Sequence, residues 1–231
     1  MNITTLILIY VGVAIVGSRL PIIRVYFAHL HNLVNLVISV CLEGGRENKI
    51  QLYQDGSAET TGNMTSSIKK ALISYAGYTG TSVAAIGLFY LVSRGYFHLI
   101  IYLFFGLTVL ALFLWIRNLF GVIWGFSLAF LLALPVSFRY YGSLLPIDVN
   151  YEMIVLHLSI LIASVLFIQS IICAIQVCKQ VFMARSNPAR KVALVQTKFV
   201  LAVVLGLTLV GQTVYAGFYF IQNFISLPFS F

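Results

Sequence analysis

Long apolar runs separated by short polar segments make up most of this chain, and they constrain its fold more than any other feature. Seven runs can be recognised, at about 3–18, 22–42, 71–93, 96–116, 119–138, 151–178 and 199–220. Hydrophobic residues form 61% of the 231 residues and charged residues only 9%, a balance that soluble domains of this size do not have. An apolar helix of about 20 residues crosses a bilayer. We therefore predict one all-α polytopic membrane domain over residues 1–231, with about seven transmembrane helices.

The segment between the second and third apolar runs has a different pattern. Residues Lys49 to Tyr53 alternate between polar and apolar side chains, which is typical of a half-buried strand. Asp55-Gly56 follows, and Asp-Gly between two alternating runs is a strong signal for a hairpin turn. We predict a short membrane-associated β-hairpin within an insertion at residues 43–62, directly after the second helix.

The same segment carries a family resemblance. The order Gly44-Gly45-Arg46, Ile50-x-Leu52 and Asp55-Gly56-Ser57 resembles the segment after the zinc-binding helix of site-2-protease-type intramembrane zinc metallopeptidases, in particular their compact bacterial B-like branch. The stretch AGYTG at 76–80 is similar to the family's AGYLGP. The resemblance implies that the hairpin holds an extended substrate by strand addition. It nominates six residues as substrate or partner contacts: Gly44, Gly45, Arg46, Asp55, Gly56 and Ser57.

The zinc-binding helix of that family reads HExxH, in which two histidines bind zinc and the glutamate acts as general base. The best match here is His31-Asn32-Leu33-Val34-Asn35. Asn32 replaces the glutamate and Asn35 replaces the second histidine, and a neutral amide is not a useful base. We therefore interpret His31, Asn32 and Asn35 as a vestigial motif, and we expect no catalytic residue and no bound cofactor.

A zinc site rebuilt from other ligands is an alternative that the sequence leaves open. His157, near the start of the sixth apolar run, is the candidate second ligand beside His31. His29 lies about 200° from His31 around a helix, so the two cannot face one metal. Without a metal, His31 and Asn35 are expected to hydrogen-bond each other or a neighbouring helix. The small residues at 76–80 favour close helix packing.

Basic residues predict the orientation in the membrane. The loop at 179–198 contains five Lys and Arg residues and no acid, so we expect it on the cytoplasmic side. Counting back through seven spans puts the hairpin and the amino terminus on the cytoplasmic side too, and the carboxyl terminus outside. Short loops and small size suggest a bacterial plasma membrane.

Three functions are compatible with these features. The leading hypothesis is a pseudoprotease, which acts as a binding, chaperoning or regulatory subunit for another membrane protein or peptide. The alternative is an active intramembrane zinc metalloprotease with unorthodox ligands, and the third is a small transporter component. The expected partners are the lipid bilayer and a membrane protein or peptide. Since the sequence carries no nucleic-acid motif, nucleic acid is not expected among them.

Overall fold

A computed structural model describes residues 3–43, 49–61, 67–141, 150–183 and 199–224. Over these ranges the chain forms seven helices and a two-stranded antiparallel sheet. The predicted all-helical fold with a hairpin after the second helix is thereby confirmed. The elements in chain order are α1 (Ile3–Gly17), α2 (Pro21–Glu43), β1 (Lys49–Leu52), β2 (Ala58–Thr61), α3 (Ser67–Ser93), α4 (Phe97–Leu114), α5 (Leu119–Tyr141), α6 (Tyr151–Met183) and α7 (Phe199–Phe224).

Five helices are long and apolar enough to cross a membrane, when only the described residues are considered. They belong to α2, α3, α4, α5 and α6, while α1 is a shorter apolar helix of 15 residues. Because a bilayer core requires about 20 residues of helix, the chain is a multi-pass membrane protein. The expected count of seven helices is met, and five of them satisfy the length and hydropathy of a span.

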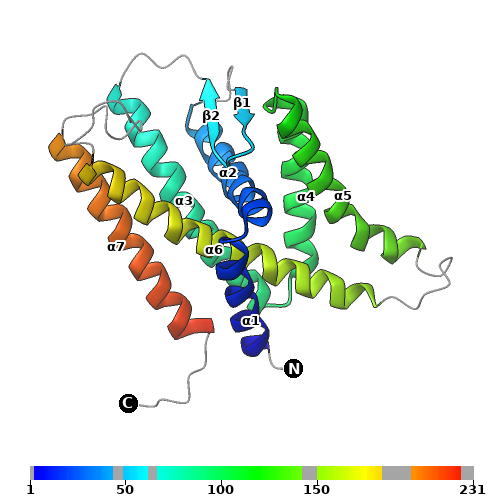
Figure 1. The fold of residues 1–231 in the computed structure, drawn as a ribbon. Helices are drawn as coiled ribbons and strands as arrows, with labels where there is room; N and C mark the ends of the chain where they lie inside the picture. Colours follow the sequence, from blue (N-terminus) through cyan, green and yellow to red (C-terminus); the bar gives the residue numbers. More distant parts are fainter. Residues whose placement is uncertain (1–2, 44–48, 62–66, 142–149, 184–198, 225–231) are drawn as a thin grey trace, which may run out of the picture.

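The central helix of the bundle is α6, which packs against each of the other six helices and crosses the bundle diagonally in Figure 1. Its residues 162–170 are buried without interruption, so protein covers every face of that segment. Hydrogen bonds also join α6 to the segments around it. The Gln169 side chain donates to Ser18 Oγ at 3.0 Å, and the Ser159 hydroxyl donates to the Phe97 carbonyl oxygen at 3.0 Å.

The link between α1 and α2 differs from the expected topology. The Arg19 N–H donates to the Val16 carbonyl at 2.9 Å and the Leu20 N–H donates to the Gly17 carbonyl at 3.1 Å, so the chain continues in helical turns and does not reverse. The start of α1 lies at the end of the bundle opposite the hairpin, as does the end of α7 (Figure 1). The expectation that the amino terminus shares a side with the hairpin does not fit this arrangement.

The small residues at 76–80 bring α3 close to α2, as the sequence indicated. A Cβ atom added to Gly77 would collide with the amide oxygen of Asn35, and one added to Gly80 would collide with the side chain of Ile38. Both glycines therefore occupy places where a neighbouring side chain uses the space that a methyl group would take. Close approach of this kind is a main source of helix association in lipid.

We predict that Gly77→Ala destabilises the bundle by about 1–3 kcal/mol, because the added methyl group must displace Asn35. The measurement is unfolding in mixed micelles with increasing denaturing detergent. Gly87→Ala is the matched control on the same helix, since a Cβ atom there meets nothing within 4 Å, and alanine favours helix more than glycine does. Equal unfolding curves for the two variants would contradict the packing argument.

Candidate functional site

The hairpin (residues 49–61) is closed by a tight turn. β1 and β2 pair antiparallel over four residue pairs. The Gly56 N–H donates to the Tyr53 carbonyl at 3.0 Å, and the Tyr53 N–H donates to the Ser57 carbonyl at 3.0 Å. Gly56 has a φ of +88°, which glycine adopts more readily than residues with a Cβ atom. The Asp55-Gly56 signal therefore marks the turn correctly.

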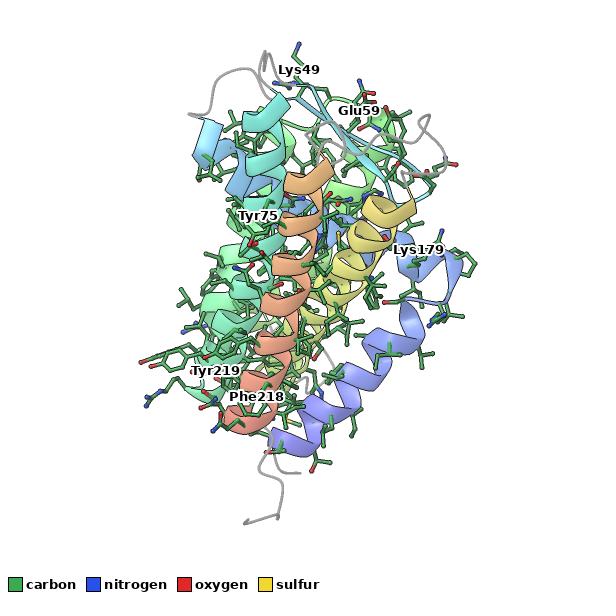
Figure 2. All side chains as sticks on the ribbon, turned by 90° about the vertical axis from the view of Figure 1, so that its left-hand side faces the viewer. Lys49, Glu59, Tyr75, Lys179, Phe218 and Tyr219 are labelled. Atoms are coloured by element: carbon green, nitrogen blue, oxygen red, sulfur yellow. The ribbon has the colours of Figure 1, made fainter. Side chains whose placement is uncertain are left out.

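The hairpin has one apolar and one polar face. Ile50 and Leu52 are buried against the bundle, as the alternating pattern predicts. The outer face carries exposed side chains of Lys49, Gln51, Tyr53 and Glu59, and Lys49 and Glu59 lie at one end of the molecule in Figure 2, far from Phe218 and Tyr219 at the other. The Tyr53 hydroxyl donates to Glu59 at 3.1 Å, and this bond to a carboxylate raises the pKa of Tyr53.

The outer edge of β1 is occupied by the link between α4 and α5. The Ile50 N–H donates to the Trp115 carbonyl at 2.9 Å, and the Arg117 N–H donates to the Ile50 carbonyl at 3.3 Å. Asn118 then binds both backbone groups of Leu52: its Oδ1 accepts from the Leu52 N–H at 3.0 Å, and its amide nitrogen donates to the Leu52 carbonyl. β1 therefore has partners along both edges.

The outer edge of β2 is different. In an antiparallel pair, opposite residues alternate between exchanging hydrogen bonds and pointing their backbone groups outward. Ile50 and Leu52 direct theirs away from β2, so their opposite residues, Thr60 and Ala58, direct theirs away from β1. Within the described residues, no backbone or side-chain group binds the outward N–H and C=O groups of Ala58 and Thr60. Among the described residues, the hairpin thus has one strand edge without a partner.

The hairpin turn packs against α2, the helix that carries His31, Asn32 and Asn35. A Cβ atom on Gly56 would lie 3.2 Å from the Ala28 side chain, so the turn touches the helix directly. His29 Nε2 lies 2.9 Å from the Tyr53 carbonyl oxygen. The Asn32 amide nitrogen donates to the Gly56 carbonyl oxygen at 3.2 Å and lies 3.4 Å from His29 Nδ1. Two side chains of α2 therefore bind two carbonyl groups of the turn.

His29 is completely buried where α2 meets α5. Its ring packs edge-on against Phe120 and Trp124 of α5, with ring centroids 5.7 and 5.6 Å away. These two aromatic rings and its hydrogen bonds together fix the position of the imidazole.

The other two motif residues do not join this contact. His31 is buried, and neither of its ring nitrogens has a partner among the described residues. The Asn35 amide oxygen accepts a long hydrogen bond from Ser39 at 3.4 Å and lies against Gly77. Among the described residues, His31 and Asn35 therefore do not hydrogen-bond each other, and His31 binds no neighbouring helix. The structure separates the three motif residues into a hairpin contact, a buried imidazole and a helix-packing contact.

Zinc, which the resemblance implies, does not fit these residues. A zinc site requires three or four nitrogen, sulfur or carboxylate ligands around one point, and the described residues contain no group of three His, Cys, Asp or Glu side chains that could hold a metal ion. Asn32 is already bound to the hairpin. His157 makes its hydrogen bond to the Tyr10 hydroxyl, 2.9 Å from Nδ1.

Three of the six nominated contact residues can be placed. Asp55, Gly56 and Ser57 form the turn, where Asp55 Oδ1 accepts from the Ser57 hydroxyl at 2.6 Å and from the Ser57 N–H at 2.9 Å. The segment Gly44-Gly45-Arg46 lies outside the described residues.

Comparison with known proteins identifies the family of this chain. The model of the Peptidase M50B-like family matches residues 4–165, from α1 into α6, and so includes the motif helix and the hairpin. The chain belongs to this family. No curated protein and no solved structure matches it. The matched residues of this Peptidase M50B-like chain include His31, Asn32 and Asn35 on α2 and the hairpin that follows.

Two residues of this site are not evident from the sequence. His29 falls outside HExxH in the best alignment, and its contact with the hairpin depends on the turn folding back over α2. Asn118 lies 66 positions from Leu52. Its signal is the polar pair Arg117-Asn118 between two apolar runs, which marks a loop and does not identify what the loop binds.

The hydrogen bonds from Ser57 hold the pKa of Asp55 below its ordinary value of 3.8, with the hydroxyl as the larger cause and the backbone N–H next. A lowered pKa means that the turn is stabilised above pH 3.8 and loses this contribution as the pH falls through the lowered value. We predict that Ser57→Ala raises the pKa of Asp55 toward 3.8, as followed by carboxyl carbon chemical shifts in micelles. Ser39→Ala, on α2, should leave it unchanged; an unchanged pKa in Ser57→Ala would refute the assignment.

Proposed function

We propose that this Peptidase M50B-like chain is a non-proteolytic membrane protein that binds an extended segment of another membrane protein or peptide. The observation that carries the proposal is the hairpin, which is fixed on both sides and keeps one unpaired strand edge on β2. A bound segment would add as a third strand along Ala58 and Thr60. Backbone hydrogen bonds would supply the affinity, so the interaction requires neither zinc nor a general base.

The fixed position of the hairpin supports this mode of binding. An isolated two-stranded hairpin is marginally stable in water, but here the α4–α5 link and α2 hold it in place. Binding to a surface that is already ordered avoids the entropy loss of ordering it. Asp55, Gly56 and Ser57 then serve to build the edge, and the exposed side chains of Tyr53 and Glu59 beside it can contact the side chains of the bound segment.

The charge distribution supports a cytoplasmic location for this edge. The basic segment expected as a loop at 179–198 begins within α6, which extends to Met183 and whose carboxyl-terminal end lies at the hairpin end of the bundle (Figure 1). Short loops rich in Lys and Arg stay in the cytoplasm. We propose that the hairpin insertion at 43–62 and this basic segment face the cytoplasm, and that the start of α1 and the end of α7 lie toward the other side of the membrane.

The proposal predicts that Ala58→Pro weakens partner binding by about tenfold, because proline removes the outward N–H and places its ring on the edge. Proline is tolerated on an edge strand when the lost N–H has no partner within the sheet. A photoreactive residue in place of Glu59, on the exposed face, reports binding as the yield of crosslinked product in native membranes.

Ala58→Val is the matched control, because it enlarges the same side chain and keeps the N–H. Its crosslinking yield should equal that of the unchanged edge. If Ala58→Pro crosslinks as well as Ala58→Val, the edge of β2 is not the binding surface.

The metalloprotease alternative makes the opposite prediction about metal. We expect the purified protein to contain no more zinc than His31→Ala, because the described residues provide no set of ligands for a metal. The measurement is zinc content by mass spectrometry after purification in detergent with zinc supplied during growth. About one zinc per chain, lost in His31→Ala, would establish the alternative with His31 as a ligand and overturn the non-proteolytic assignment.

A further inference from the structure

We infer that His29 and Asn32 form a polar clamp that holds the hairpin turn on α2, and that position 32 carries an amide because the clamp needs a hydrogen-bond donor there. The clamp is defined by two residues, His29 and Asn32, and by the two carbonyl groups they bind, those of Tyr53 and Gly56. This inference does not depend on the identity or existence of a partner.

The donors and acceptors of His29 and Asn32 match those of the hairpin turn. A carbonyl oxygen only accepts, so His29 Nε2 must carry the hydrogen that reaches the Tyr53 carbonyl. In a neutral imidazole the other nitrogen, Nδ1, is then an acceptor. The Asn32 amide has two hydrogens: one is directed to His29 Nδ1 and the other to the Gly56 carbonyl. Both amide hydrogens are used, and each acceptor receives one of them.

A glutamate at position 32, as in HExxH, cannot donate the two hydrogen bonds that Asn32 donates. An ionised carboxylate has no hydrogen to donate. At position 32 it would leave the Gly56 carbonyl oxygen without its donor, and it could bind His29 Nδ1 only if the imidazole took up a proton. Buried or half-buried acceptors without a donor cost free energy. The amide at position 32 is therefore explained by a contact that it makes, in addition to the catalytic group that it replaces.

The hairpin is held from two directions, by α2 and by the α4–α5 link. The clamp binds the turn from α2, whereas Asn118 binds Leu52 of β1 from the α4–α5 link. His29 links α2 to α5, since its ring packs against Phe120 and Trp124. The hairpin is thus fixed at its turn and along β1, and within the part of the chain that the structure describes β2 is the strand with a free edge.

The experiment is amide hydrogen exchange in the hairpin of the full-length protein in micelles. Asn32→Asp keeps the size of the side chain and removes both donated hydrogens. We expect the amides of Tyr53 and Gly56, which close the turn, to exchange about tenfold faster, with no change in the amides of α6. The matched control is Asn35→Asp, the same substitution one turn along α2, which should leave exchange in the hairpin as it is.

A second variant keeps the test decisive if the new carboxylate disturbs α2. His29→Phe retains a ring between Phe120 and Trp124 but cannot donate to the Tyr53 carbonyl, and it should also speed exchange of the turn amides. Unchanged turn exchange in both Asn32→Asp and His29→Phe would overturn the clamp. Equal acceleration by Asn35→Asp would overturn it as well, since the effect would then follow from any charge placed on α2.

Discussion

The packing of α6 against all six other helices is the constraint on which the rest of this structure depends. Helices in lipid gain little from burying apolar surface against each other, so close contact and polar contacts between helices must hold them. Residues 162–170 of α6 are buried on every side. Its Gln169 and Ser159 reach Ser18 at the end of α1 and Phe97 at the start of α4. α2 occupies its place because α3 and α6 both pack against it, and α2 in turn carries the hairpin turn.

The hairpin depends on a second constraint, the need of backbone polar groups for partners near the membrane. β1 meets this need through β2 on one edge and through the α4–α5 link on the other. Asn118 imitates a strand residue here, because one amide side chain accepts from the N–H and donates to the carbonyl of Leu52. The same chemistry recurs at Asn32. At both places an asparagine binds backbone, and the hairpin becomes a fixed part of the bundle.

Features encoded by local pattern could be predicted from the sequence. The alternation from Lys49 to Tyr53 and the Asp55-Gly56 pair predict the hairpin, because strand period and turn conformation are local properties. The small residues at 76–80 predict close packing for a similar reason, although the partner side chains, Asn35 and Ile38, are evident only in the fold.

Features that depend on the direction of the chain could not be predicted in this way. The length of an apolar run does not reveal whether residues 18–20 reverse the chain or continue it, and the hydrogen bonds at Arg19 and Leu20 decide the matter. The contact of His29 was missed for a related reason, since it requires the hairpin to fold back over α2. The interpretation from the sequence groups His31, Asn32 and Asn35 as one vestigial zinc motif. In the fold, each of the three residues has a separate environment.

An unpaired strand edge is a hazard that proteins usually cover or interrupt, because it can pair with any extended chain. The edge of β2 is short, and Glu59 beside it is charged, which limits indiscriminate pairing. Nevertheless the clamp and Asn118 hold the hairpin so that, among the described residues, β1 is covered and β2 is not. A mobile hairpin would lose its edge whenever it moved, whereas a clamped one presents it continuously. Among the described residues, the arrangement is therefore better suited to receiving a strand than to excluding one.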